Sequence, residues 1–95
     1  LRDDAARARL VGAELHASRG DRSEALAALA EAMSLASTWD AAEQVRAAAV
    51  FLACDRPDAA RPRLVYAETS LGDRHDEAAQ AIRARIVVLR GRLAP

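Results

Sequence analysis

Apolar residues return at spacings of three and four along most of the chain, which is the spacing of one face of an α-helix. No run alternates between apolar and polar residues for long enough to predict a strand. The spacing predicts five helices, over residues 2–18, 21–36, 40–53, 58–71 and 73–93. We therefore expect an all-α protein. Because the connections are only two to five residues long, consecutive helices are expected to lie antiparallel, as helical hairpins do.

Acidic residues mark the expected starts of the helices. Asp21 and Asp40 are each followed three residues later by a glutamate, which is the spacing of a capping box. We interpret four aspartates as helix caps, namely Asp21, Asp40, Asp58 and Asp73. Since capping accounts for these carboxylates, no pair is left in an apolar face, where a general acid would acquire a raised pKa.

Pro62 lies about four residues into the expected fourth helix. A proline has no backbone N–H, and in a helix interior it costs about 3 kcal/mol. We therefore predict that Pro62 lies within the first turn or so of this helix and that this first turn is distorted.

One set of apolar positions recurs after 35 residues. Aligning the first hairpin on the second at this offset pairs Leu10 with Val45, Ala13 with Ala48, Leu15 with Val50, Ala25 with Ala60, Leu29 with Leu64 and Ala32 with Ala67. Small residues at such positions let two helices cross closely, since a larger side chain would push their axes apart. The chain is therefore predicted to contain two similar hairpins and one further helix.

This arrangement resembles the tetratricopeptide repeat (TPR), a helical pair with a period of about 34 residues. The residues that match the family best are Gly20-Asp21, Glu24-Ala25, Leu29, Ala32 and Leu35. The resemblance covers roughly residues 6–71. It departs from the family at Arg9 and His16, where aromatic residues are usual, and at Ser37, where a proline is common. A generic antiparallel α-bundle is the alternative.

The resemblance implies a TPR-like right-handed superhelix of about two repeats plus a C-terminal helix. The corresponding boundaries are a single domain over 1–95, with repeat one at 6–39, repeat two at 40–74 and the last helix at 75–93. Because the chain begins with Leu and its first residues already have a helical pattern, we expect a fragment of a longer protein.

Composition narrows the class of protein. Ala supplies 25 of the 95 residues and aromatics only three, so burial must come from close approach of small side chains. The 14 arginines balance 14 carboxylates, which removes the electrostatic attraction expected for a binder of nucleic acid or of an anionic membrane. No segment approaches the roughly 20 apolar residues of a membrane span. A protein or peptide is the expected partner, with no nucleic acid and no membrane.

The reactive side chains of the sequence form no catalytic group. His16 and His75 have no cysteine or second histidine at ligand spacing, so we expect no metal site. Cys54 has no adjacent histidine, and a small apolar residue near a helix end explains it. We expect no enzyme and no cofactor. A single cysteine without a disulfide partner fits a cytoplasmic protein, and basic residues that are all arginine suggest a GC-rich bacterial genome.

In the family that the chain resembles, the first helices of successive repeats line a concave groove. Position by position, the resemblance places in this groove Arg7, Leu10, Val11, Glu14 and Ala17, followed by Ala42, Val45, Arg46, Ala49 and Leu52. Glu14 and Ala49 stand where some members have asparagines that bind a peptide carboxylate, so only Arg46 could serve a similar purpose.

The expected fifth helix has two apolar stripes. Ala79, Ile82, Ile86, Leu89 and Leu93 form one stripe, and Ala81, Ala84, Val87 and Val88 form a second on the opposite side. The last helix of a repeat array usually turns a polar face to solvent. We therefore predict that Ala84, Val87 and Val88 form an association face, either with other parts of a parent protein or in a homodimer.

The leading functional interpretation is a noncatalytic protein-interaction scaffold, a segment of a larger bacterial regulatory or signalling protein. Two alternatives stay open. One is a domain that senses a small apolar ligand or short peptide in the groove, and the other is a small helical dimerisation module.

Overall fold

The computed structural model describes residues 2–93, and it confirms an all-α fold for them, with no β-strand among these residues. The helices are α1 (Arg2–Ser18), α2 (Arg22–Leu35), α3 (Ala41–Ala53), α4 (Pro57–Leu71) and α5 (Glu77–Leu93). Three-residue connections follow α1 and α3, and five-residue connections follow α2 and α4. The expected number and order of helices are therefore confirmed.

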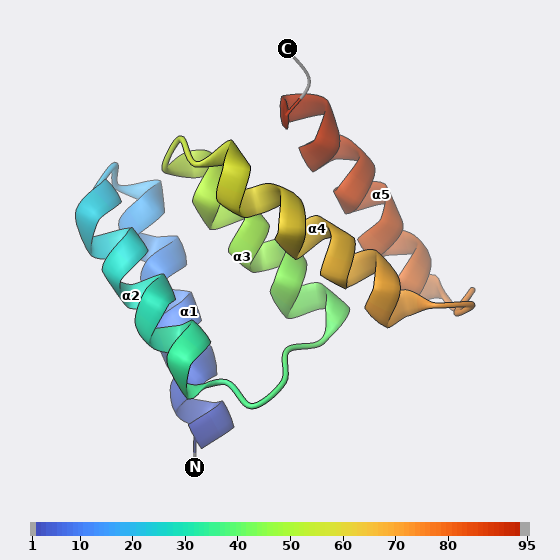
Figure 1. Cartoon of the computed structure of the whole chain (residues 1–95), viewed down its shortest axis with the longest axis horizontal. Coiled ribbons are helices and arrows are strands. Elements are labelled where there is room, and N and C mark those ends of the chain that lie inside the picture. Colours follow the sequence, from blue (N-terminus) through green and yellow to red (C-terminus); the bar gives the residue numbers. More distant parts are fainter. Residues whose placement is uncertain (1, 94–95) are drawn as a thin grey trace.

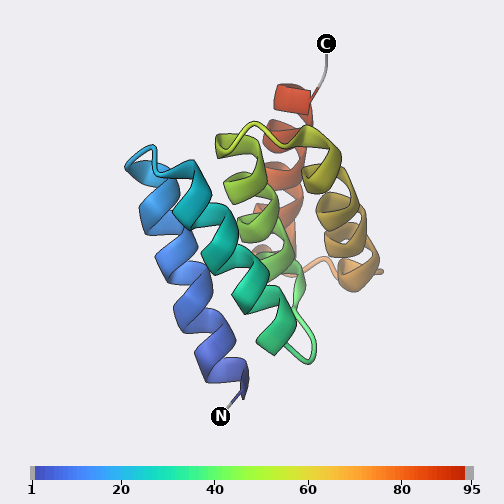
Figure 2. The same cartoon turned by 60° about the vertical axis from the view of Figure 1, so that its left-hand side comes forward.

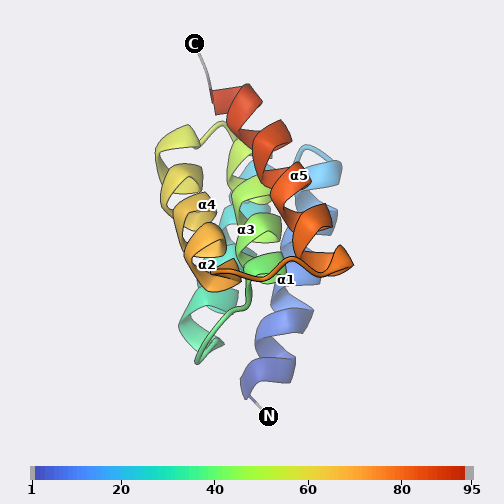
Figure 3. The same cartoon turned by 90° about the vertical axis from the view of Figure 1, so that its right-hand side faces the viewer.

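The helices form two antiparallel hairpins, α1–α2 and α3–α4, with α5 along the second (Figure 1). α3 lies at the centre and contacts each of the other four helices. Seen from two further directions, α1, α3 and α5 form one side of the molecule, whereas α2 and α4 form the other (Figures 2 and 3).

The turns inside the two hairpins have matching hydrogen bonds at the 35-residue offset. In the first, the N–H of Asp21 donates to the carbonyl of His16 at 2.9 Å; in the second, the N–H of Arg56 donates to the carbonyl of Phe51 at 2.8 Å. The residue before each donor has a left-handed backbone, with φ of 79° at Gly20 and 61° at Asp55. Both turns therefore end their first helix in the same way, with the hydrogen bond of a Schellman motif.

The core consists of two apolar clusters, and α3 contributes to both. The cluster of the first hairpin contains Leu10, Ala13, Ala25, Leu29, Ala32, Ala47, Val50 and Cys54. The cluster of the second hairpin and α5 contains Ala41, Val45, Ala48, Ala60, Leu64, Ala67, Leu71, Ala79, Ile86 and Leu89. Of the six pairs of positions expected to match, five are buried in both hairpins. At the sixth pair, Leu15 is exposed whereas Val50 is buried.

One predicted capping box is confirmed and the other is wrong. Asp40 accepts the N–H of Glu43 at 2.9 Å, and the Glu43 carboxylate accepts the N–H of Asp40 at 3.1 Å. Asp21 also precedes a helix, but its side chain makes no capping hydrogen bond. The preceding turn fixes the ψ of Asp21 at 72°, whereas Asp40 is extended at 176°. The Asp21 carboxylate lies beside His16 instead, with 3.7 Å between Oδ2 and Nδ1.

The predictions for Pro62 and for the Asp58 cap are wrong. α4 starts at Pro57, because a proline suits the first position of a helix, and Arg56 is the residue before it. Asp58 is therefore inside the first turn and is not the cap. Pro62 is the sixth residue of a continuous helix and therefore lies in its second turn instead of its first. Asp58, the residue whose carbonyl loses its partner, is exposed, so water can satisfy that carbonyl.

The start predicted for the last helix is also wrong, because Asp73 does not cap it. α5 begins at Glu77, and Asp76 accepts the N–H of Ala79 at 2.8 Å. The guanidinium of Arg74 donates to both Asp76 oxygens, at 3.0 and 3.1 Å, and lowers the pKa of this carboxyl to about 2. Arg83 donates to the carbonyls of Gly72 and Arg74, which ties α5 to the connection that precedes it.

Candidate functional site

An open groove of about 290 Å³ runs between α1, α3 and α5. Its lining residues are Glu14, Ala42, Val45, Arg46, Ala49, Ala81, Ile82 and Arg85. The floor consists of small and branched aliphatic side chains, and the charged groups stand at its edges. The resemblance placed five of these residues in a groove, and the structure brings those five together.

An ion pair joins α1 to α3 at the edge of the groove. Arg46 donates to both Glu14 oxygens, from Nε at 3.0 Å and from Nη2 at 2.5 Å. The hydrogen bonds to Glu14 raise the pKa of Arg46 above its ordinary value. Both side chains are more than a third exposed, so this pair fixes the spacing of α1 and α3 more than it stabilises the fold.

A second hollow of about 210 Å³ continues the groove along α1 and α3. It shares Glu14, Arg46 and Ala49 with the first and adds Ala17 and Ala53 to the apolar lining. The ion pair therefore lies between two apolar stretches of one surface. A partner that contacts both stretches has to cross the Arg46–Glu14 pair.

Arg85 was not among the residues predicted for the groove. It comes from α5, which the sequence interpretation treated only as a helix with two apolar stripes. Within residues 2–93 the Arg85 guanidinium makes no ion pair or hydrogen bond, whereas Arg46 is held by Glu14. The groove therefore contains one arginine that is already paired and one that is open to an anionic partner.

Four residues predicted for the groove lie elsewhere, and one of them, Leu52, is partly buried against the core cluster of the second hairpin and α5. Leu10 is completely buried in the first core cluster and offers no surface to a ligand. Arg7 donates toward Glu43, with 3.3 Å between Nε and Oε2, and thereby links α1 to the buried capping box of α3. Val11 is 55% exposed but does not line the groove.

The two stripes of α5 differ in burial. The stripe of Ala79, Ile86 and Leu89 packs into the core, whereas Val87 is 69% exposed and Val88 is 52% exposed. Ala81 and Ala84 are exposed beside these valines. The second stripe is thus a surface of the folded chain, continuous through Ala81 with the groove.

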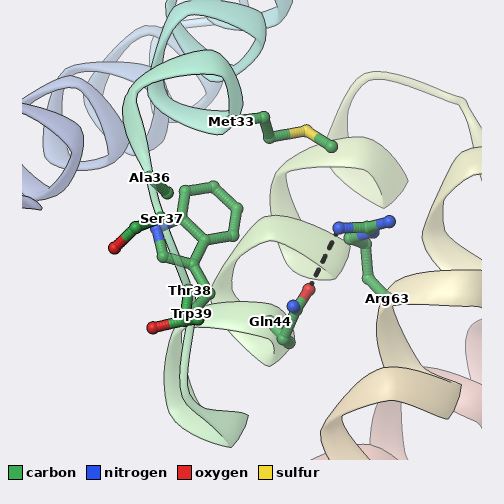
Figure 4. Close-up of a pocket in the computed structure, with 7 residues that line it drawn as sticks. All are labelled: Met33, Ala36, Ser37, Thr38, Trp39, Gln44 and Arg63. Atoms are coloured by element: carbon green, nitrogen blue, oxygen red, sulfur yellow. Dashed lines mark hydrogen bonds between the residues drawn. The ribbon is translucent and has the colours of Figure 1, made fainter.

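A further pocket of about 220 Å³ lies between the end of α2, the connection 36–40, α3 and α4. It is lined by Met33, Ala36, Ser37, Thr38, Trp39, Gln44 and Arg63 (Figure 4). The sequence interpretation gave no role to this region. The one available signal was the position of Trp39, the only tryptophan, in a connection between helices.

The remaining reactive groups are Cys54 and the two histidines. Cys54 is buried, and burial raises the pKa of its thiol, which disfavours the nucleophilic thiolate. No group of three or more histidine, cysteine or carboxylate side chains within residues 2–93 could hold a metal ion. None of the helices there combines the length and apolar character needed to cross a bilayer.

No protein-family model, curated protein or solved structure matches the chain. The functional inference therefore depends on the residues themselves. The observations that bear on it are the 35-residue recurrence, the two matching turns and the apolar groove on α1, α3 and α5.

Proposed function

We propose that the protein is a noncatalytic, TPR-like interaction scaffold that binds a segment of another protein in the groove on α1, α3 and α5. We further propose that it is part of a larger bacterial regulatory or signalling protein. The observation that carries the proposal is the groove itself, an apolar surface formed by three helices and bordered by charged groups.

The matching turns support a repeat architecture. Both hairpins have the same turn hydrogen bond and a left-handed residue at the same position, 35 residues apart. Both also bury a small, a large and a small residue at matching positions of their second helix. In a repeat array, equivalent helices line up along one face and create an extended surface for a partner. α1 and α3 are the equivalent helices here, and α5 extends the same side of the molecule (Figure 3).

The shape of the groove favours a peptide over a small ligand. Pockets for small molecules usually enclose 70–90% of their ligand's surface. This groove is bounded by the sides of three helices and is open opposite them, so a small molecule would leave much of its surface in water. A peptide can instead follow the groove into the second hollow and contact both apolar stretches.

A selection experiment tests this proposal. The full chain is used to select from a phage-displayed library of random peptides, and the binding of an enriched peptide is measured by calorimetry. Ala49→Glu introduces a charge into the floor, and we expect it to weaken binding by about tenfold or more, equivalent to ~1.4 kcal/mol. Val65→Glu is the matched control, because Val65 is 53% exposed on α4, outside the groove. A selection without enrichment, or peptides that bind Ala49→Glu unchanged, would contradict the proposal.

The exposed stripe of α5 favours a second function, dimerisation. Two adjacent valines that are each more than half exposed give α5 an unusually apolar solvent face. We expect Val87→Glu combined with Val88→Glu to preserve the helical circular dichroism and to halve the mass measured by sedimentation. A wild-type chain that sediments as a monomer at every concentration would exclude this function for the isolated chain.

A further inference from the structure

The pocket beside Trp39 is separate from the groove. It lies on the side of α2 and α4, and it shares none of its lining residues with the groove. Its walls come from one continuous stretch, residues 33–44, which comprises the end of α2, the following connection and the start of α3, and from Arg63 in the middle of α4. The wall has an apolar part and a cationic part.

Trp39 supplies the apolar part. Its indole nitrogen lies on the side of Ser37, and its six-membered ring lies toward Met33 and Arg63 (Figure 4). The indole N–H is buried and has no hydrogen-bond partner within residues 2–93. A ligand in the pocket therefore meets the carbon edge of the ring together with the Met33 side chain. Such a wall favours a flat apolar group, especially an aromatic ring.

Arg63 supplies the cationic part. Its Nη1 donates to the Gln44 side-chain oxygen at 3.2 Å, and its guanidinium carbon lies 4.7 Å from the centre of the Tyr66 ring. These two contacts hold the guanidinium in place. No carboxylate within residues 2–93 lies within 4.0 Å of it, and most of its five N–H donors are unused. A positioned guanidinium with free donors suits the planar, two-oxygen geometry of a carboxylate.

We propose that this pocket binds an aromatic carboxylate, with its ring against Trp39 and Met33 and its carboxylate on Arg63. The volume of about 220 Å³ accommodates a single ring with a short acidic group, and the pocket is open to solvent, which leaves room for the rest of a larger ligand. A free aromatic acid and the C-terminal phenylalanine of a peptide share this chemistry. The site shares no lining residue with the groove, so the tests below do not depend on the proposed scaffold function.

The only tryptophan of the chain lies in the wall, so its fluorescence reports binding directly. The full chain is titrated with benzoate, with benzamide, which keeps the ring without the charge, and with acetate, which keeps the charge without the ring. We expect a saturable change with benzoate and affinities about tenfold or more weaker for the other two, since benzamide lacks the charge that pairs with Arg63 and acetate lacks the ring that packs against Trp39. Equal responses to benzoate and benzamide, or no saturable response to benzoate, would overturn the proposal.

Two variants locate the anion. Arg63→Gln should weaken benzoate binding by about tenfold or more. Arg63→Lys keeps the charge and should retain part of the affinity for benzoate. Arg61→Gln is the matched control, because Arg61 is exposed on the same helix and does not line the pocket. Unchanged affinity in Arg63→Gln, or equal loss in Arg61→Gln, would contradict the assignment. Circular dichroism of each variant shows whether the fold is retained.

A last comparison identifies the source of the ligand. N-acetyl-phenylalanine has the terminal carboxylate and ring of a peptide end, and benzoate represents a free acid. Tighter binding of N-acetyl-phenylalanine than of benzoate would assign the pocket to a peptide C-terminus, and the reverse order would assign it to a small aromatic acid. Either order supports the carboxylate site provided that both affinities fall in Arg63→Gln.

Discussion

The two hairpins have the same interior and different surroundings. Ala25, Leu29 and Ala32 of α2 are as completely buried as their equivalents in α4. α1 and α3 differ, however, because α3 lies between the first hairpin and α5, whereas α1 is covered on one side only. Leu15 is consequently 47% exposed, while its equivalent Val50 is 2% exposed. The repeated residues therefore determine the packing within a hairpin, and position along the chain determines which other residues become buried.

The hairpins also differ at matched positions of the backbone. Gly20 and Asp55 have the same left-handed conformation, which glycine adopts without cost and aspartate does not. Ala27 and Pro62 are each the sixth residue of their helix. At each of these two pairs, one hairpin can be given the residue of the other. The substitution in one hairpin should raise the free energy of unfolding, and the reverse substitution in the other hairpin should lower it.

The largest expected effect concerns the buried leucines at the centre of each hairpin. Leu29→Ala and Leu64→Ala remove side chains that are 0% and 1% exposed, so each should lower the free energy of unfolding by about 2–5 kcal/mol. Chemical denaturation measures both values. If the hairpins have equivalent interiors, the two losses should be similar; a large loss at one site and almost none at the other would contradict that equivalence.

The next effect concerns Pro62. Pro62→Ala restores a backbone N–H inside α4, and we expect it to raise the free energy of unfolding by up to about 3 kcal/mol. Ala27→Pro makes the opposite change in α2 and should lower it by about 3 kcal/mol or more. Thermal and urea unfolding of both variants test the pair. Destabilisation by Pro62→Ala would show that the proline is favourable where it is.

The left-handed turn residues should give a smaller effect. Asp55→Gly removes the cost of φ = 61° for a residue with a Cβ and should stabilise by about 1 kcal/mol. Gly20→Asp imposes the same cost on the first turn and should destabilise by a similar amount. The two shifts in the denaturation midpoint are expected to have opposite signs. Shifts of the same sign would mean that the turns are not equivalent.

The helix starts are a further difference between the two hairpins. Asp40→Ala removes a capping hydrogen bond and should cost about 1 kcal/mol. Asp21→Ala removes no capping hydrogen bond, so we expect a loss of at most a few tenths of a kcal/mol. Both are measured by urea denaturation at neutral pH. A cost at Asp21 equal to that at Asp40 would show that Asp21 caps α2 in solution.

The smallest effect concerns acid and the start of α5. The pKa of Asp76 is lowered to about 2, below its ordinary value near 3.9, so its ionised form is favoured in the folded chain. Its stabilising contribution is therefore complete above about pH 4 and is lost as the pH falls toward 2. Asp76→Asn should lower the thermal midpoint at pH 6 and have almost no effect at pH 2. If the thermal midpoint of Asp76→Asn is as far below that of the wild type at pH 2 as at pH 6, the stabilisation does not come from the ionised Asp76 carboxylate.

The helical periodicity predicted the five helices because burial of one face is a local property of the sequence. The details of the helix starts were harder to predict, since Asp21 has the spacing of a capping box but a backbone fixed by the preceding turn. The second buried side of α3, with Ala47 and Val50, depends on contacts with a distant hairpin. The same holds for Arg63 and Arg85, whose surroundings are created by the packing of separate helices.

The recurring hairpins, as proposed above, build a surface for a partner on α1, α3 and α5. The most direct measurement is an NMR titration of the isotope-labelled chain with a peptide enriched by selection. We predict that the shifted amide signals concentrate at residues 42–49 and 81–85, which include the floor of the groove. Shifts confined to residues 57–71 of α4, on the opposite side, would contradict the claim.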